Sequence, residues 1–87
     1  PVFDANPNVE TVEKSIDNVV ISSIRVNEKN KLNGLTIKES GIRETTNGLI
    51  IGIERNENKI FNPASSTVFE RDDIVWIAGE REKIKFY

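Results

Sequence analysis

Residues 49–61 read LIIGIERNENKIF, and this stretch decides the class of fold. Residues 49–54 (LIIGIE), apolar as far as Ile53, predict a strand that is buried on both faces at its start. The polar residues 55–58 predict a chain reversal, and residues 59–61 then return antiparallel to complete a hairpin.

Side-chain alternation along the first strand sets Leu49, Ile51 and Ile53 on one face. Ile50 and Gly52 then lie on the opposite face. A glycine in the interior of a strand often marks a bulge or a close approach of another backbone. We therefore expect a bulge or a close backbone approach at Gly52.

Three more stretches predict strands because they are rich in β-branched and aromatic residues. They are residues 19–26 (VVISSIRV), residues 66–70 (STVFE) and residues 74–78 (IVWIA). Residues 80–87 remain open between the first turns of a helix and a terminal strand. Together these elements indicate an α+β fold of mostly antiparallel strands with one or two short helices.

A short helix is predicted from Ile37 to Ser40. Thr36 and Glu39 have the spacing of a capping box, in which each side chain accepts a hydrogen bond from the other residue's backbone N–H. Gly41 is a natural end for this helix, because glycine adopts the left-handed conformation at little cost. Residues 1–17 are predicted to form a linker or arm ahead of a domain at 18–87, with residues 9–16 either a short helix or extended.

The composition excludes several classes of function. The chain has no Cys and no His, which removes disulfides, thiolate zinc sites and the usual catalytic triads. Its net charge of −2 argues against nucleic acid as a partner. No apolar run approaches the roughly 20 residues that a membrane helix requires. We expect no enzyme activity, no catalytic residue and no metal site, and the start at Pro1 without Met suggests a fragment of a longer protein.

Three stretches resemble one known family, the RCK C-terminal domain, also called the TrkA-C domain. Residues 32–37 (LNGLTI) are similar to the segment that opens the family's helix, with Leu35 where Lys is usual. Residues 48–55 (GLIIGIER) are similar to a family strand that ends in Arg. Pro63, Thr67-Val68 and residues 73–79 (DIVWIAG) resemble the closing pattern, although Asp72 stands where the family prefers Gly.

The resemblance implies a domain that forms homodimers and regulates a membrane transporter for potassium, other cations or solutes. It implies a location at the cytoplasmic face of the bacterial inner membrane. The partners would be a second copy and membrane-embedded transporter segments of the same or another chain. The alternative is a purely structural assembly module of a transporter that binds no ligand.

Some members of the family bind cyclic di-AMP, and the resemblance carries their ligand pattern onto four residues here. These are Leu49, Ile50, Arg55 and Pro63. Ile53 stands where the pattern has Asp, and Phe61-Asn62 replace Asn-Ile. No cofactor is expected apart from a regulatory ligand of this type.

Two residues keep alternative interpretations at this point. Arg55 could bind a phosphate, because guanidinium forms paired hydrogen bonds with oxyanions, or it could pair with Glu54 or Glu57. Trp76 could stack on a ligand, but burial in the core or at a dimer interface is favoured. For the adjacent Asp72 and Asp73, hydrogen bonds to local backbone are favoured over a metal or acid–base pair.

Overall fold

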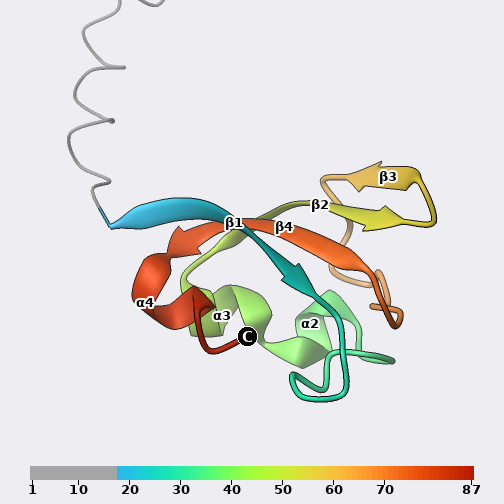
Figure 1. Cartoon of the computed structure of the whole chain (residues 1–87), viewed down its shortest axis with the longest axis horizontal. Helices are drawn as coiled ribbons and strands as arrows, with labels where there is room; N and C mark the ends of the chain where they lie inside the picture. The colour runs from blue at the N-terminus through green and yellow to red at the C-terminus, as the bar shows by residue number, and fades with distance from the viewer. Residues whose placement is uncertain (1–17) are drawn as a thin grey trace, which may run out of the picture.

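The computed structural model describes residues 18–87 and arranges them in two layers (Figure 1). One layer is a four-stranded sheet in the order β1-β4-β2-β3, with every neighbouring pair antiparallel. The strands are β1 (Val19–Arg25), β2 (Leu49–Arg55), β3 (Asn58–Phe61) and β4 (Ile74–Glu80). The predicted α+β class and the hairpin of β2 and β3 are confirmed.

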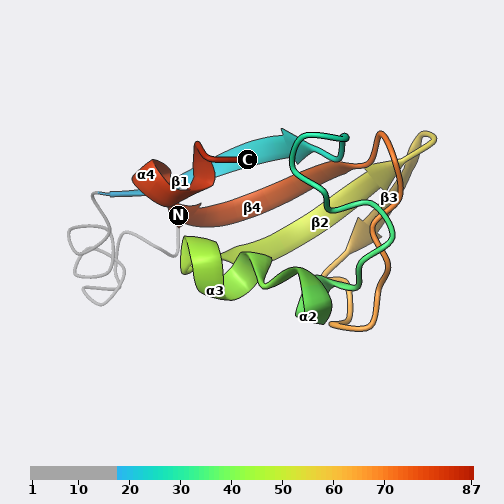
Figure 2. The same ribbon diagram turned by 90° about the horizontal axis from the view of Figure 1, so that it is seen from below.

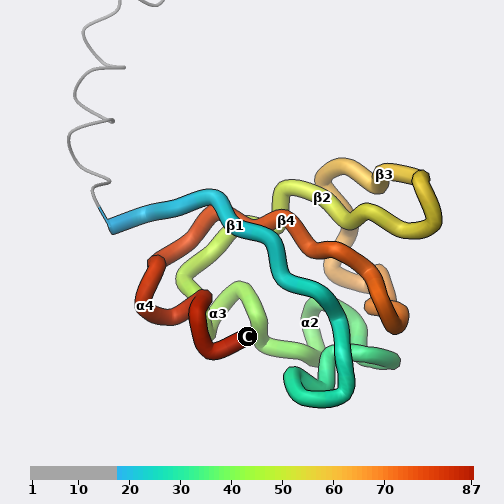
Figure 3. The backbone as a smooth tube through the Cα atoms, viewed as in Figure 1, coloured from blue at the N-terminus to red at the C-terminus, as the bar shows by residue number. Residues whose placement is uncertain are grey.

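The second layer consists of three short helices on one side of the sheet (Figure 1). They are α2 (Ile37–Ser40), α3 (Ile42–Thr46) and α4 (Arg81–Ile84). Figure 3 traces the chain from β1 through the long 26–36 loop to α2. Figure 2 shows β1, β4 and β2 side by side, with the β3 arm at one end of the molecule.

The hydrophobic core lies between the sheet and the helix layer. Alternation in β4 points Val75 and Ile77 toward this core, and both are fully buried. Aliphatic residues dominate the interior, which Phe69 completes from the loop before β4. Its buried members are Ile24, Val26, Leu32, Ile37, Ile42, Ile50, Ile53, Phe69, Val75, Ile77 and Ile84.

A bulge interrupts β2 at the position where its glycine predicted one. The pairing of β2 with β4 shifts between Ile50 and Gly52, so Ile51 is the extra residue. Because the extra residue reverses the alternation, Ile50 and Ile53 both face the core while Leu49 and Ile51 face outward. The expectation that Ile53 shares a face with Leu49 and Ile51 was therefore wrong.

The predicted strand at 66–70 is not formed. One isolated bridge joins Val68 to Thr36, and Phe69 N–H donates to the carbonyl of Leu35 at 2.9 Å. The ladder cannot lengthen because Thr36 is the N-cap of α2 and the helix begins at the next residue. This segment pairs with the helix entry instead of joining the sheet.

The helix layer decides one open alternative and adds one helix that was not expected. Residues 81–84 form α4, which is the helical alternative for residues 80–87, because a helical turn places Ile84 in the core. Helix α3 was not predicted; it follows α2 directly, with Gly41 at φ 66° as the hinge between them. The arm at 1–17 and the alternatives for residues 9–16 lie outside the described residues.

The capping box at the start of α2 is present with both of its hydrogen bonds. Glu39 N–H donates to Thr36 Oγ1 at 3.0 Å, and Thr36 N–H donates to Glu39 Oε1 at 3.0 Å. These bonds lower the pKa of Glu39, with the bond from the Thr36 backbone as the largest cause. The box fixes the entry of a helix whose first residue, Ile37, is in the core.

Replacing the cap, Thr36→Ala, is expected to lower the free energy of unfolding by about 1 kcal/mol. The substitution removes the acceptor for Glu39 N–H while leaving Ile37 in place. Urea unfolding followed by circular dichroism measures the change. Thr45→Ala, at an exposed position within α3, is the matched control, and an equal loss in both variants would contradict a special role for the cap.

Candidate functional site on the uncovered sheet face

The face of the sheet opposite the helices carries a group of exposed apolar side chains. In β1 the outward positions include Val19 and Ile21, and the cross-strand register continues the group onto the neighbouring strands. Monomeric proteins seldom expose large contiguous apolar patches without a binding role. We call this the outer face, and its apolar residues are Val19, Ile21, Leu49, Ile51, Phe61, Trp76 and Ala78.

Trp76 lies near the centre of the outer face. Its neighbours in β4, Val75 and Ile77, occupy the core, so alternation directs the indole outward, where 37% of the residue is exposed. Nε1 donates a hydrogen bond of 2.6 Å to Oε1 of Glu54, which satisfies the polar end of the ring. Burial of Trp76 in the core, one of the favoured interpretations, was therefore wrong, and the interface and ligand-stacking interpretations remain.

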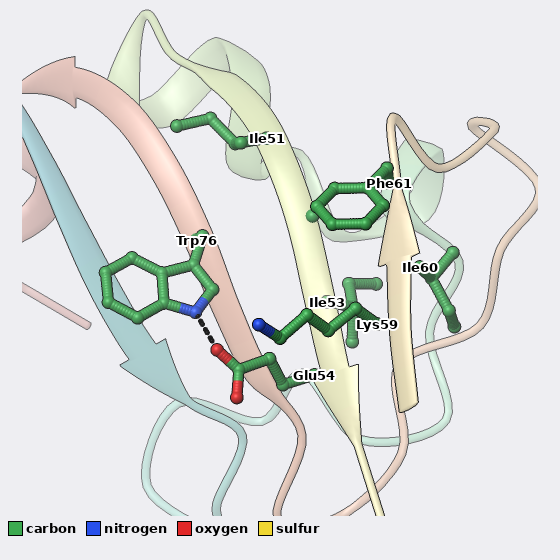
Figure 4. A pocket seen from close by; sticks show the side chains of 8 residues that line it. Ile51, Ile53, Glu54, Lys59, Ile60, Phe61 and Trp76 are labelled. Atoms are coloured by element: carbon green, nitrogen blue, oxygen red, sulfur yellow. Dashed lines mark hydrogen bonds between the residues drawn. The ribbon is translucent and has the colours of Figure 1, made fainter. Parts of the chain in front are cut away.

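A hollow of about 280 Å³ opens on the outer face beside Trp76 (Figure 4). Its walls come from β2, β3 and β4, with the indole on one side and the Phe61 ring on the other. Gly52 belongs to the lining, and a Cβ atom at this position would lie 2.9 Å from the carbonyl oxygen of Ile60, so only glycine fits there. The lining residues are Ile51, Gly52, Ile53, Glu54, Lys59, Ile60, Phe61 and Trp76.

Sequence reasoning had not selected most of the lining of this hollow. Phe61 is 73% exposed on a strand that also faces the core, and its exposure depends on the register between β2 and β3. Lys59 and Glu54 are direct cross-strand partners on the same face. The exposure of Phe61 could have been predicted from the side-chain alternation in β3. This alternation sets Lys59 and Phe61 on one side of the strand and Ile60 on the other.

Arg55 ends β2, and its guanidinium group is held by hydrogen bonds and ion pairs within the chain. Its Nε and Nη2 donate to the two carboxylate oxygens of Asp73 at 2.9 and 2.7 Å. Nη2 also donates to the carbonyl of Val68 at 2.9 Å, and Nη1 lies 2.9 Å from Oε2 of Glu70. The prediction that Arg55 pairs with Glu54 or Glu57 was wrong.

The electrostatics of this network are those of a bidentate ion pair with a buried carboxylate. Asp73 is 1% exposed, and its Oδ2 also accepts from Glu70 N–H at 2.8 Å. The expected hydrogen bond of Asp73 to local backbone is confirmed. The hydrogen bond to Asp73 raises the pKa of Arg55, which stays protonated in any case. Arg55 thus anchors the end of β2 to the turn before β4.

The four residues of the predicted ligand site are not brought together in one copy of the chain. Leu49 and Arg55 stand at opposite ends of β2, about 20 Å apart at the usual rise per residue. The side chain of Leu49 is exposed on the outer face, whereas Ile50 packs into the core. Pro63 is buried, and its carbonyl oxygen accepts a long hydrogen bond of 3.4 Å from Arg43 Nη2. Their ligand role stays a prediction.

The described part of the chain lacks two other kinds of feature. Between residues 18 and 87, no three acidic side chains gather in an arrangement that could bind a metal ion. In the same range, no helix has the length and apolar character needed to cross a membrane.

Comparison with known proteins decides the family. Residues 21–85 match the sequence model of the TrkA-C domain. The chain belongs to the TrkA-C domain family. The match runs from Ile21 in β1 to Lys85 after α4, so it includes the sheet and the outer face except for the first two residues of β1.

The TrkA-C domain is similar to a curated relative, the K⁺/H⁺ antiporter subunit KhtT of Bacillus subtilis. The two are 27% identical over 78 residues, which cover 88% of this chain and 47% of the antiporter subunit. The chain therefore spans about half the length of this relative.

Solved structures share the fold. The RCK C domain of the potassium transport protein KtrA, in complex with cyclic di-AMP, gives a TM-score of 0.70 at 24% identity and covers 94% of each chain. The RCK C domain dimer of BusR from Streptococcus agalactiae, also with cyclic di-AMP, gives 0.67 at 26% identity, covering 77% of this chain and 92% of that one. BusR is also known in complex with promoter DNA.

Proposed function

We propose that this TrkA-C domain is a regulatory and dimerisation module of a bacterial potassium or cation transport system, located at the cytoplasmic face of the membrane. The observation that carries the proposal is the uncovered apolar outer face on a domain of this family. The module performs no chemistry. It acts by pairing with a second copy, and the membrane-embedded segments follow the geometry of the pair.

A regulatory ligand fits this mechanism if it binds one geometry of the pair better than another. The ligand that the relatives suggest is cyclic di-AMP, which the RCK C domains of KtrA and BusR bind. In this chain the exposed Leu49 is the part of the predicted site that two paired copies could share. Arg55 would contact a phosphate through Nη1, which pairs with the exposed Glu70, while Nε and Nη2 stay on Asp73.

Pairing through the outer face is tested with Leu49→Asp. The wild-type chain is expected to sediment as a dimer at micromolar concentration, and the variant to dissociate at least about 100-fold more readily, because pairing would bury an unpartnered carboxylate. Phe86→Asp is the matched control, since Phe86 is 80% exposed but lies beyond β4 and α4, off the sheet. A wild-type chain that stays monomeric at several hundred micromolar overturns the proposal.

Ligand binding separates the regulatory module from a purely structural one. Thermal unfolding in cyclic di-AMP is expected to show a concentration-dependent rise in Tm, because a ligand of the folded state stabilises it by mass action. Linear adenine dinucleotides serve as the chemical control. No rise with saturating cyclic di-AMP favours the structural module, in which the domain assembles the transporter and binds nothing.

A further inference from the structure

The outer face carries an apolar side chain that projects and, next to it, a recess with a largely apolar lining. Trp76 on β4 projects outward beside the hollow (Figure 4), and Gly52 on β2 is one of the residues that line the hollow. Trp76 and Gly52 are direct cross-strand partners in the sheet. We call a set of residues that are paired across neighbouring strands a row. The largest side chain and the smallest residue of the face are therefore adjacent in one row.

This adjacency has a consequence for two copies stacked face to face. A twofold axis that lies between the two sheets, parallel to the strands and midway between β4 and β2, exchanges β4 of one copy with β2 of the other. It then sets each Trp76 opposite the partner's Gly52. A twofold interface requires such self-complementarity, in which the same patch supplies both halves of each contact.

We propose that the indole of Trp76 fills the hollow that Gly52 helps to line in a second copy of this chain, and that the second copy does the same in return. The proposal rests on the proposed dimerisation and specifies its geometry. Twisted sheets stack about 10 Å apart with strand directions within about 30° of each other, a spacing that interdigitating side chains fill.

The same axis matches large with small residues elsewhere on the face. It sets Leu49 opposite the partner's Ala78, because both lie in the row that contains Ile21. It sets Phe61 opposite the partner's Ser23, in the row of Trp76. Alternation of large and small residues across facing positions is how layers of side chains reach the packing density of a protein interior.

The charged end of the face lies at the rim of this arrangement. Arg25 and Lys59 share the outermost row with Glu54, and the axis sets Arg25 near the partner's Lys59. Both cations are on solvent-exposed side chains, so salt and water screen their repulsion. The apolar rows therefore determine the fit, and the charged row forms its border.

The hollow could instead take a small molecule, but the features of the face favour a second copy. It is open toward solvent along one side of the sheet, and its walls continue into the apolar residues of the neighbouring rows. The outer face of a second copy covers this whole area, whereas a small ligand would leave Ile21 and Leu49 exposed. The match of Trp76 to the hollow needs no component outside this chain.

Trp76 is the sole tryptophan, so its fluorescence reports the proposed contact directly. In a dilution series of the full 87-residue chain, emission is expected to shift to longer wavelength and acrylamide quenching to increase as sedimentation shows the dimer dissociating. A dimer whose emission and quenching equal those of the monomer overturns this geometry while leaving dimerisation intact. A chain that never dimerises overturns both.

A pair of variants tests the fit in both directions. Trp76→Ala removes the projection, and Ile51→Phe fills the recess; each alone is expected to weaken self-association at least about 30-fold. Mixed together they should associate more tightly than either alone, because the intact Trp76 of one chain meets the intact hollow of the other. Phe86→Ala is expected to leave association unchanged. A mixture no tighter than its separate components overturns the proposal, provided that circular dichroism shows both variants folded.

Discussion

Asp73→Ala is expected to lower the free energy of unfolding by about 3 kcal/mol, since removal of one partner from a buried ion pair leaves the other charge uncompensated. Asp73 is buried and accepts from both Arg55 and Glu70 N–H, so one truncation removes three hydrogen bonds. The partial exposure of Arg55, 22% of its side chain, places the loss at the lower end of the range for buried pairs. Urea unfolding at a fixed protein concentration measures it.

Asp72→Asn is the matched control for this prediction. Asp72 is the exposed neighbour, and its φ of 70° is one that Asn also tolerates, so a change within about 0.5 kcal/mol is expected. Arg55→Met is expected to lower the free energy of unfolding less in the Asp73→Ala background than in the wild-type chain, because the two residues share one network. Equal losses in the two backgrounds would show that the pair is not coupled.

Phe69→Ala is expected to destabilise the domain by about 3–5 kcal/mol. Phe69 is fully buried and comes from a segment that makes one bridge instead of a ladder. Its ring therefore anchors residues 67–70 to the core, and its truncation leaves a cavity that the surrounding β-branched side chains cannot fill without strain. Calorimetric or denaturant unfolding measures the loss.

Val68→Ala, one residue earlier, is the control for Phe69→Ala. Val68 is partly exposed on the other side of the same segment, so a loss below about 1 kcal/mol is expected. A similar loss in the two variants would mean that the segment is held by its backbone hydrogen bonds to residues 34–38 and that the ring contributes little.

Local signals in the sequence were enough to predict the parts of the fold that depend on them. The capping box at Thr36 and Glu39 and the hairpin of residues 49–61 each rest on neighbours within a few positions. The prediction of a strand at 66–70 was wrong because a strand there would need an extended partner segment. Residue 36 is the last extended residue before α2, so only one bridge forms. Helix α3 was missed because its start depends on Gly41 serving as both a helix end and a hinge.

The candidate site could be predicted less well than the fold. Ile53 changes face because of one extra residue at Ile51, and a bulge position cannot be fixed by alternation alone. Arg55 finds its partner 18 positions away, whereas the sequence offers nearer acids at Glu54 and Glu57. Whether Trp76 faces the core or the outer face depends on which side of β4 the helices cover, which is decided by the whole fold.

The position of β1 at the edge of the sheet has a mechanical consequence. Val19 pairs with Glu80 at the last position of β4, and Arg81 N–H donates to the carbonyl of Asn18, so the chain enters the sheet and leaves it at one corner. A pulling force applied between the segment before Val19 and helix α4 therefore acts at this corner. It breaks the hydrogen bonds between β1 and β4 one pair after another, which needs less force than shearing all of them at once. The domain is thus mechanically weakest along the direction in which the preceding chain is attached.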